Sequence, residues 1–143
     1  MRRREFIALI GGVAAWPIAA RAQQAEKVLH VGLVLTTAPG AEMVGSDPIH
    51  PPTRAFVHAL RDLGYIEGRN LVLERRSAEG QFERFGDIVA GLVRLKVDVI
   101  MTGGNPPARA AKAVTTTVPI VAVAVADPVA DGLVQSLARP GGA

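Results

Sequence analysis

The sequence predicts an α/β fold in three layers: a parallel β-sheet with helices on both faces. Four segments are candidate strands, and three of them are almost continuously apolar, as is typical of parallel strands buried on both faces. Segments with apolar residues at helical spacing lie between these strands. Because helical crossovers between strands produce a parallel sheet covered by helices, the predicted element order is β-α-β-α-β-α-β-α.

The first half of this pattern begins with an apolar strand at residues 28–35 and a loop rich in Gly and Pro at residues 36–52. A helix follows, and Gly64 stands where a glycine C-cap is expected. Residues 71–76 form a second, more polar strand, which we expect near an edge of the sheet. The apolar residues that define the helix are Phe56, Leu60 and Leu63.

The second half contains a strong helical stripe, then strands at residues 97–101 and 119–125. Between these strands a helix begins at a Pro pair and runs over residues 106–114, because proline is accepted in a first helical turn. A last helix is predicted after a turn at residues 127–129. The stripe consists of Phe85, Ile88, Val89, Leu92 and Leu95, and the last helix carries Leu133, Val134 and Leu137.

Residues 1–22 have the organisation of a secretory signal peptide. A basic start is followed by an apolar run at residues 6–16, which is too short to span a bilayer, and by a small-residue cleavage site that ends at Ala22. Residues 3–7, which read Arg-Arg-Glu-Phe-Ile, resemble a twin-arginine export signal. We therefore expect cleavage after Ala22, a periplasmic protein, and a single mature domain at residues 23–143.

Composition narrows the possible partners of that domain. Four of the 16 Lys and Arg residues, but one of the 13 Asp and Glu residues, lie in the leader, so the mature chain has no net charge. This balance argues against nucleic acid and anionic membranes as partners. No second hydrophobic stretch precedes a basic stop, so we expect no stable membrane insertion. The chain has no Cys, which excludes disulfides and a lipid-anchoring cysteine.

The candidate ligand-binding residues lie where the predicted strands end. In open parallel sheets, ligands bind at the carboxyl ends of the strands, beside the point where the strand order reverses. The residues predicted to contact a ligand at these ends are Thr36, Thr37, Thr102, Gly103, Gly104, Asn105 and Asp127.

For each group of candidate residues, the sequence allows a ligand-binding role and an alternative structural role. Residues 102–106 form a glycine-containing turn before a helix, where backbone N–H groups suit a carboxylate; the alternative is an ordinary strand-to-helix turn. The hydroxyls of Thr36 and Thr37 can bond a polar solute, or can mark a polar strand end. Asp127 can bind a ligand amine, although an Asx turn or N-cap before Pro128 is favoured there.

Catalytic, metal and cofactor sites are not expected. The histidines lack metal-ligand spacing, and no carboxylate pair resembles an acid/base dyad. No serine lies in a G-x-S-x-G elbow, and neither a GxGxxG fingerprint nor a Walker loop is present. The histidines are His30, His50 and His58.

Several segments together resemble the exported solute-binding proteins of ABC transporters, in the group that includes tryptophan- and tyrosine-type binding proteins. Their order and spacing carry the resemblance, which covers essentially the whole chain. The matching segments are residues 2–7, residues 63–70 (Leu-Gly-Tyr-Ile-Glu-Gly-Arg-Asn), residues 97–100 (Val-Asp-Val-Ile), residues 118–121 (Val-Pro-Ile-Val), and residues 127–142 from Asp-Pro-Val to Ala-Arg-Pro-Gly-Gly.

The resemblance implies two lobes of the type I periplasmic binding protein fold, with a small-molecule solute captured between them and delivered to an ABC transporter permease. By this comparison the mature chain is the amino-terminal lobe, truncated before the second lobe. Strand four is strongly apolar, and a further strand beside it would remove an exposed edge. Residues 43–52 form a longer and more proline-rich loop than the family pattern.

The leading hypothesis is therefore the periplasmic solute-binding component of an ABC-type importer, which captures an amino acid or related compound without catalysis. The alternative is an exported small α/β enzyme such as a hydrolase, against which the missing catalytic signatures argue. The sensor half of a sugar-responsive regulator has a similar fold, but the leader stands where its DNA-binding segment would be.

Overall fold

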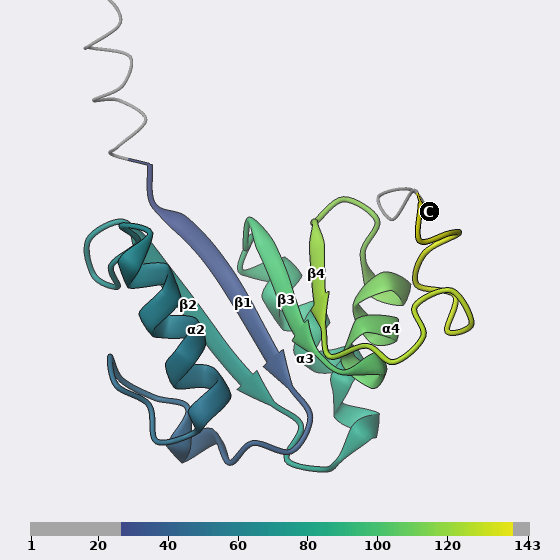
Figure 1. The fold of residues 1–143 in the computed structure, drawn as a ribbon, viewed down its shortest axis with the longest axis horizontal. Coiled ribbons are helices and arrows are strands. Elements are labelled where there is room, and N and C mark those ends of the chain that lie inside the picture. Colours follow the sequence, from purple (N-terminus) through teal and green to yellow (C-terminus); the bar gives the residue numbers. More distant parts are fainter. Residues whose placement is uncertain (1–26, 139–143) are drawn as a thin grey trace, which may run out of the picture.

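Four parallel strands form the centre of the computed structural model, which describes residues 27–138 (Figure 1). The order across the sheet is β2-β1-β3-β4, so β1 and β3 are central and β2 and β4 are the edges. The strand order reverses between β1 and β3, which makes their carboxyl ends the topological switch point. The strands are β1 (Leu29–Leu35), β2 (Leu71–Ser77), β3 (Val99–Gly103) and β4 (Ile120–Val123).

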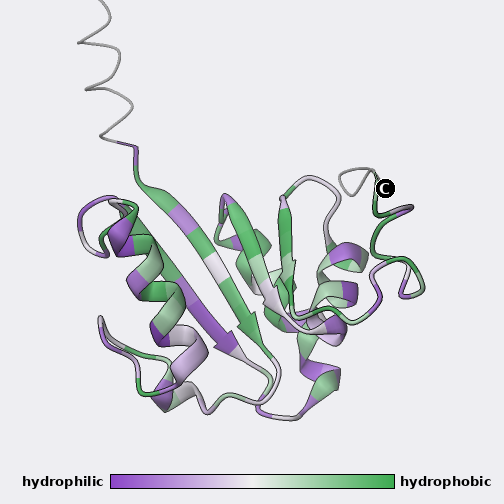
Figure 2. Cartoon of the chain, viewed as in Figure 1, coloured by the Kyte–Doolittle hydropathy of each residue, from purple (hydrophilic) through white to green (hydrophobic). Residues whose placement is uncertain are grey.

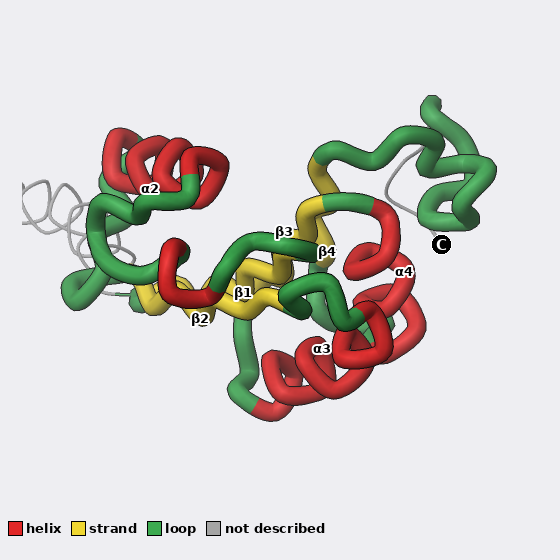
Figure 3. The backbone as a smooth tube through the Cα atoms, turned by 90° about the horizontal axis from the view of Figure 1, so that it is seen from below, coloured by secondary structure: helices red, strands yellow, loops and turns green. Residues whose placement is uncertain are grey.

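Helices cover both faces of the sheet, which confirms the predicted three-layer arrangement. Figure 3 shows α2 on one face and α3 with α4 on the other. Two short 3₁₀ turns, at Gly40–Glu42 and Phe82–Arg84, lie in the connections that follow β1 and β2. The helices are α2 (Pro51–Asp62), α3 (Phe85–Arg94) and α4 (Asn105–Val114).

The sheet separates two apolar cores, one under each helical layer. The core beneath α2 contains Val31, Leu33, Ala38, Met43, Val57, Leu71 and Leu73. The core beneath α3 and α4 contains Val34, Ala78, Phe85, Val89, Leu92, Val97, Ile100 and Ala111. Figure 2 shows the corresponding pattern: apolar residues dominate β1, β3 and β4, whereas β2 becomes polar towards its carboxyl end.

Strand β1 supplies side chains to both cores because successive residues of a strand point to opposite faces. Leu33 faces α2, and Val34 faces α3 and α4. Gly32 lies on the α3 side, where a Cβ atom would come within 2.8 Å of Leu92 Cδ1. The absence of a side chain at Gly32 therefore lets α3 pack directly on the centre of the sheet.

Two residues of the predicted helical stripes lie outside the core. Leu63 is the C-cap residue of α2 and is 74% exposed, and Leu95 follows the end of α3 and is 49% exposed. Val57, on the buried side of α2, packs into the core instead. Gly64 adopts a φ of +93°, which confirms the predicted glycine C-cap.

Several predicted boundaries were displaced. The helix predicted within 106–114 begins at Asn105, β3 extends to Gly103, and the loop predicted through residue 52 ends where α2 begins at Pro51. Strand β4 is shorter than predicted and ends at Val123. The next residue, Ala124, has a φ of +55°, which is incompatible with continuing a strand.

The predicted last helix was wrong: residues 128–132 form turns, and no helix follows β4 in the described part of the chain. Gly132 has a φ of +67°, which ends the turns before a helix develops. Lys112 Nζ of α4 donates to the carbonyl oxygens of Gly132 and Leu133, which fixes this segment against α4. Its apolar residues line a cleft beside β4 rather than a helical face.

The position of β2 in the sheet agrees with the prediction from the sequence. β2 lies at one edge, as expected from its polar residues, and β4 lies at the other. Val121 of β4 is 50% exposed although it is a strand residue.

Among residues 27–138 no helix is long and apolar enough to cross a membrane. The predicted leader at residues 1–22 lies outside the described residues and stays a prediction.

We expect Gly32→Ala to lower the free energy of unfolding by about 1–3 kcal/mol, because the new methyl group would displace Leu92 in a packed core. Gly86→Ala is the matched control, since Gly86 lies in α3 with no atom near its potential Cβ. This control should gain about 0.5–1 kcal/mol from its higher helix propensity. Urea unfolding of both variants measures the difference, and equal effects would contradict the packing described.

Candidate functional site

A cavity of about 260 Å³ lies on the α2 side of the sheet, at the carboxyl ends of the two central strands. This is the topological switch point, where open α/β sheets bind ligands. The cavity is mostly apolar with a few polar groups, as small-molecule sites are. It is lined by Leu33, Leu35, Thr36, Thr37, Ala38, His50, Pro52, Thr53, Phe56, Met101, Gly103, Val123 and Ala124.

Three predicted site residues, Thr36, Thr37 and Gly103, line this cavity. The Thr36 hydroxyl donates to the Gly103 carbonyl oxygen over 3.0 Å and ties the ends of β1 and β3 together. Thr37 is exposed, and its hydroxyl has no hydrogen-bond partner among residues 27–138. The Thr37 hydroxyl is therefore free to bond a solute, whereas that of Thr36 is already used as a donor.

Gly103, the last residue of β3, and Gly104, which follows it, are required by packing and by backbone conformation rather than by a ligand alone. A Cβ at Gly103 would lie 2.7 Å from Leu35 Cδ2, and Gly104 has a φ of +95°. Gly104 N–H donates to the Val123 carbonyl oxygen over 2.9 Å, which connects the ends of β3 and β4. These glycines allow the strand ends to approach closely.

The helix starts near the cavity offer fewer backbone donors than the sequence analysis assumed. Both α2 and α4 carry a proline pair in the first turn, and proline has no N–H. In α4, Pro106 and Pro107 therefore remove two of the donors that a carboxylate would use. Recognition of a polar solute at this edge of the sheet then depends mainly on side chains.

Asn105 lies at the start of α4, and both ends of its amide are engaged within the protein. Its Oδ1 accepts from Ala126 N–H over 3.2 Å, and its Nδ2 donates to the Asp131 carboxylate. Arg109 donates to the same carboxylate over 2.8 Å. The chain thus places its own anion beside α4, and Asn105 holds the segment after β4. A ligand contact of Asn105 stays a prediction.

Two further predicted residues lie away from the cavity. Thr102 is fully buried on the face of β3 that packs under α3 and α4, opposite to the cavity, and its hydroxyl has no partner. Asp127 lies beyond the end of β4, and its carboxylate accepts from Ala130 N–H over 2.9 Å. This bond is the Asx-type turn that the sequence favoured for Asp127. Solute contacts of Thr102 and Asp127 remain predictions.

His50, Phe56 and Met101 line the cavity, although they were not among the residues predicted from the sequence. His50 is the N-cap of α2, and its Nδ1 lies 2.8 Å from Thr53 Oγ1 and 3.4 Å from Thr53 N. The sequence signal was a histidine directly before Pro51, where an N-cap residue stands. Phe56 had been assigned only to the helical stripe.

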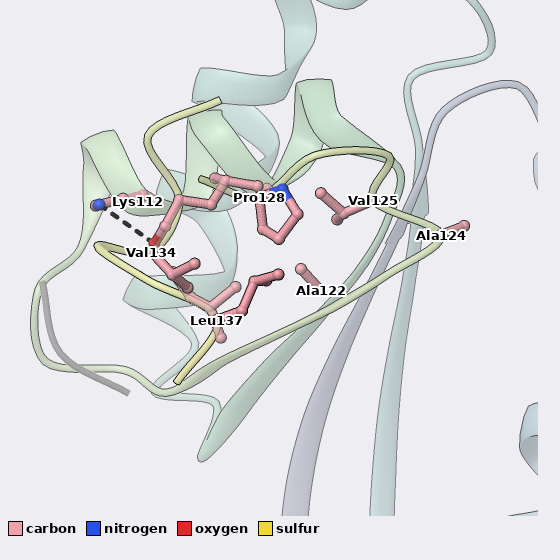
Figure 4. Close-up of a pocket in the computed structure, with 10 residues that line it drawn as sticks. Lys112, Ala122, Ala124, Val125, Pro128, Val134 and Leu137 are labelled. Atoms are coloured by element: carbon pink, nitrogen blue, oxygen red, sulfur yellow. Dashed lines mark hydrogen bonds between the residues drawn. The ribbon is translucent and has the colours of Figure 1, made fainter. Parts of the chain in front are cut away.

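A larger cleft, of about 530 Å³, lies on the other side of β4 and does not coincide with the predicted site (Figure 4). Its lining comes from α4, β4 and residues 124–137, and it is apolar except for Lys112. The Lys112 ammonium group is already bonded to the carbonyl oxygens of Gly132 and Leu133. The cleft therefore has no free polar side chain to orient a small polar solute, and the switch-point cavity is the better site.

No group of three or more His, Cys, Asp or Glu side chains that could hold a metal ion occurs among residues 27–138. His30 and His58 lie apart from the cavity: His30 N–H donates to Asp98, and His58 Nε2 lies 3.0 Å from Asp47 Oδ1. The groups that line the switch-point cavity are apolar side chains, hydroxyls and the His50 imidazole.

The described residues thus form a parallel α/β sheet with a cavity at its topological switch point. Residues 41–143 match the family described as ABC transporter substrate binding protein. The match covers well over half of the sequence, and the chain belongs to this family.

Sequence similarity to a named relative supports the family assignment. The chain is 34% identical over 102 residues to a tyrosine-binding protein of Clostridioides difficile, a match that covers 71% of this chain and 30% of the relative. The chain therefore spans about a third of the length of that relative.

Solved structures share the fold. A conserved domain protein of Vibrio cholerae has a TM-score of 0.66 at 30% identity, over 80% of this chain and 36% of its own. The ligand-free, open structure of a substrate binding protein with adhesive properties from Clostridium difficile has a TM-score of 0.66 at 29% identity, over 77% and 35%. The ABC domain of Streptococcus pneumoniae in complex with L-Trp shares the fold at 20% identity, with a TM-score of 0.67 over 81% and 37%.

We expect Thr36→Val to reduce stability by about 1 kcal/mol, because the variant loses the bond to the Gly103 carbonyl oxygen that joins β1 to β3. Thr37→Val is the matched control, since the Thr37 hydroxyl has no partner among the described residues, and its stability should change by less than about 0.5 kcal/mol. Thermal unfolding compares the two variants. An equal loss in both would refute the role assigned to Thr36.

Proposed function

We propose that the chain belongs to the solute-binding component of an ABC-type importer and supplies one side of the solute site. Membership of the substrate-binding family supports this proposal, together with a cavity at the switch point of the sheet. The mechanism is reversible capture of a small molecule between two lobes, closure of the lobes around a hinge, and delivery to a membrane permease. No bond is made or broken, so the protein is not an enzyme.

The solute is an amino acid or a related compound. Two relatives support this class, because one is named as a tyrosine-binding protein and another was solved with L-Trp. The apolar wall of the cavity, which includes Phe56 and Met101, can pack against an aromatic side chain. The polar groups at its rim, Thr37 and His50, can bond the polar end of the molecule.

We further propose that residues 1–22 are an export leader and that residues 23–143 form the amino-terminal lobe of a two-lobe protein located in the periplasm. The short span relative to the matched proteins supports the lobe assignment. Sequencing the DNA that follows the coding region tests it. A coding region for a second lobe, followed by permease and ATPase genes, is the expected result, and an unrelated neighbouring gene would count against it.

We expect the 143-residue chain to bind L-tryptophan and L-tyrosine weakly, with dissociation constants in the millimolar range or weaker. A cavity of about 260 Å³ on one lobe cannot bury the roughly 70–90% of a ligand that a good pocket buries. Isothermal titration calorimetry measures the affinity, with D-glucose as the control solute. Micromolar binding by this chain alone would contradict the requirement for a second lobe.

An activity assay tests the alternative hypothesis that the chain is an exported hydrolase. The purified chain should release no product from a panel of carboxylic and phosphate esters, because the described lining pairs only one hydroxyl with a base, Thr53 Oγ1 beside His50 Nδ1, and Thr53 is 1% exposed. Turnover that is lost when a cavity residue is substituted would favour the hydrolase instead.

A further inference from the structure

We propose that His50 contacts the solute directly, by donating a hydrogen bond from its Nε2–H group to the carboxylate of an amino acid bound in the switch-point cavity. This inference rests on the proposed solute-binding function and names the residue that would recognise the polar end of the solute. His50 is the N-cap residue of α2 and lines the cavity.

The hydrogen bonds of the imidazole ring indicate which nitrogen is available. Nδ1 lies 2.8 Å from Thr53 Oγ1 and 3.4 Å from Thr53 N, so one side of the ring caps the first turn of α2. Nε2 has no hydrogen-bond partner among residues 27–138. His50 lines the cavity, and the ring atom without a partner among the described residues is Nε2.

The cap also indicates where the proton resides. A backbone N–H group can only donate, so the contact with Thr53 N requires a lone pair on Nδ1. In a neutral imidazole, an accepting Nδ1 leaves the proton on Nε2. The imidazole of His50, a residue that lines the cavity, thus keeps its donor on Nε2.

Few other groups of the described lining can take this role. The Thr36 hydroxyl donates to Gly103, and Thr53 is 1% exposed with its hydroxyl against His50. The proline pair of α2 removes backbone donors from its first turn. Thr37 and His50 remain as the side-chain donors of the lining, and His50 is its only titratable residue.

Groups around His50 leave its ring free for this role. His50 N–H donates to the Glu42 carbonyl oxygen over 2.9 Å, and its own carbonyl oxygen accepts from Arg54 N–H over 2.9 Å. The charged side chain of Arg54 is directed to the Pro48 carbonyl oxygen and to Asp47. These contacts fix the backbone of His50, and no carboxylate among residues 27–138 bonds to its Nε2.

The first experiment measures the tautomer by ¹⁵N NMR of the imidazole side chains in the 143-residue chain at neutral pH. We expect the His50 proton on Nε2 and an unprotonated Nδ1. A proton on Nδ1 would overturn the inference, because Nε2 would then be an acceptor and would repel a carboxylate.

The second experiment titrates wild type, His50→Asn and His58→Asn with L-tryptophan, using tryptamine as the analogue without a carboxylate. Asparagine is a good N-cap, so His50→Asn keeps the start of α2 while it removes the Nε2–H donor. His58→Asn is the matched control, because His58 lies on the same helix and contacts Asp47 instead of the cavity. Chemical-shift changes report binding, and thermal unfolding confirms that all three chains are folded.

We expect L-tryptophan to shift the His50 Nε2 resonance, tryptamine to leave it unchanged, and His50→Asn to weaken L-tryptophan binding about tenfold, as the loss of a hydrogen bond to a charged group would. His58→Asn should bind as the wild type does. Shifts at Thr37 and Gly103 without a change at His50, or unchanged affinity in His50→Asn, would overturn the role of His50 and leave the proposed function standing. If no cavity resonance responds to L-tryptophan, the role of His50 in this chain is overturned, whereas the proposed function, which expects only weak binding by one lobe, is left standing.

Discussion

The parallel pairing of β1 with β3 is the contact on which the rest of the structure depends. Val31 pairs with Val99 and Val34 with Thr102, which brings the carboxyl ends of the two central strands together. Thr36 then reaches the Gly103 carbonyl oxygen, and the cavity opens directly above this junction on the α2 face. Because the chain leaves the two strands in opposite directions across the sheet, no crossover fills the space between their ends.

The two helical layers differ in the parts of the structure that they cover. The layer of α3 and α4 completes the larger buried core, and Gly32 allows Leu92 of α3 to approach the centre of the sheet. The layer of α2 also covers a core, but its first turn borders the cavity. The proline pair in that turn removes backbone donors, so the polar groups that the cavity offers at this turn are mainly side chains.

The apolar cleft beside β4 and the cavity above β1 and β3 are chemically distinct. The cleft is larger, but its one cation is already bonded to backbone carbonyl oxygens. The smaller cavity combines an apolar wall with an unpartnered hydroxyl at Thr37 and an imidazole at His50. Polar groups that orient a ligand, rather than volume, distinguish a solute site from a surface that other protein segments can cover.

The sequence by itself determined the parallel α/β class, the edge position of β2 and the glycine cap at Gly64, because apolar periodicity and cap chemistry act over a few neighbouring residues. It also located Thr36, Thr37 and Gly103 at the switch point. Only the tertiary structure decided that Thr102 faces the opposite core and that residues 128–132 turn instead of forming a helix. Those outcomes depend on strand register and on contacts from Lys112, which are distant in sequence and leave no local pattern.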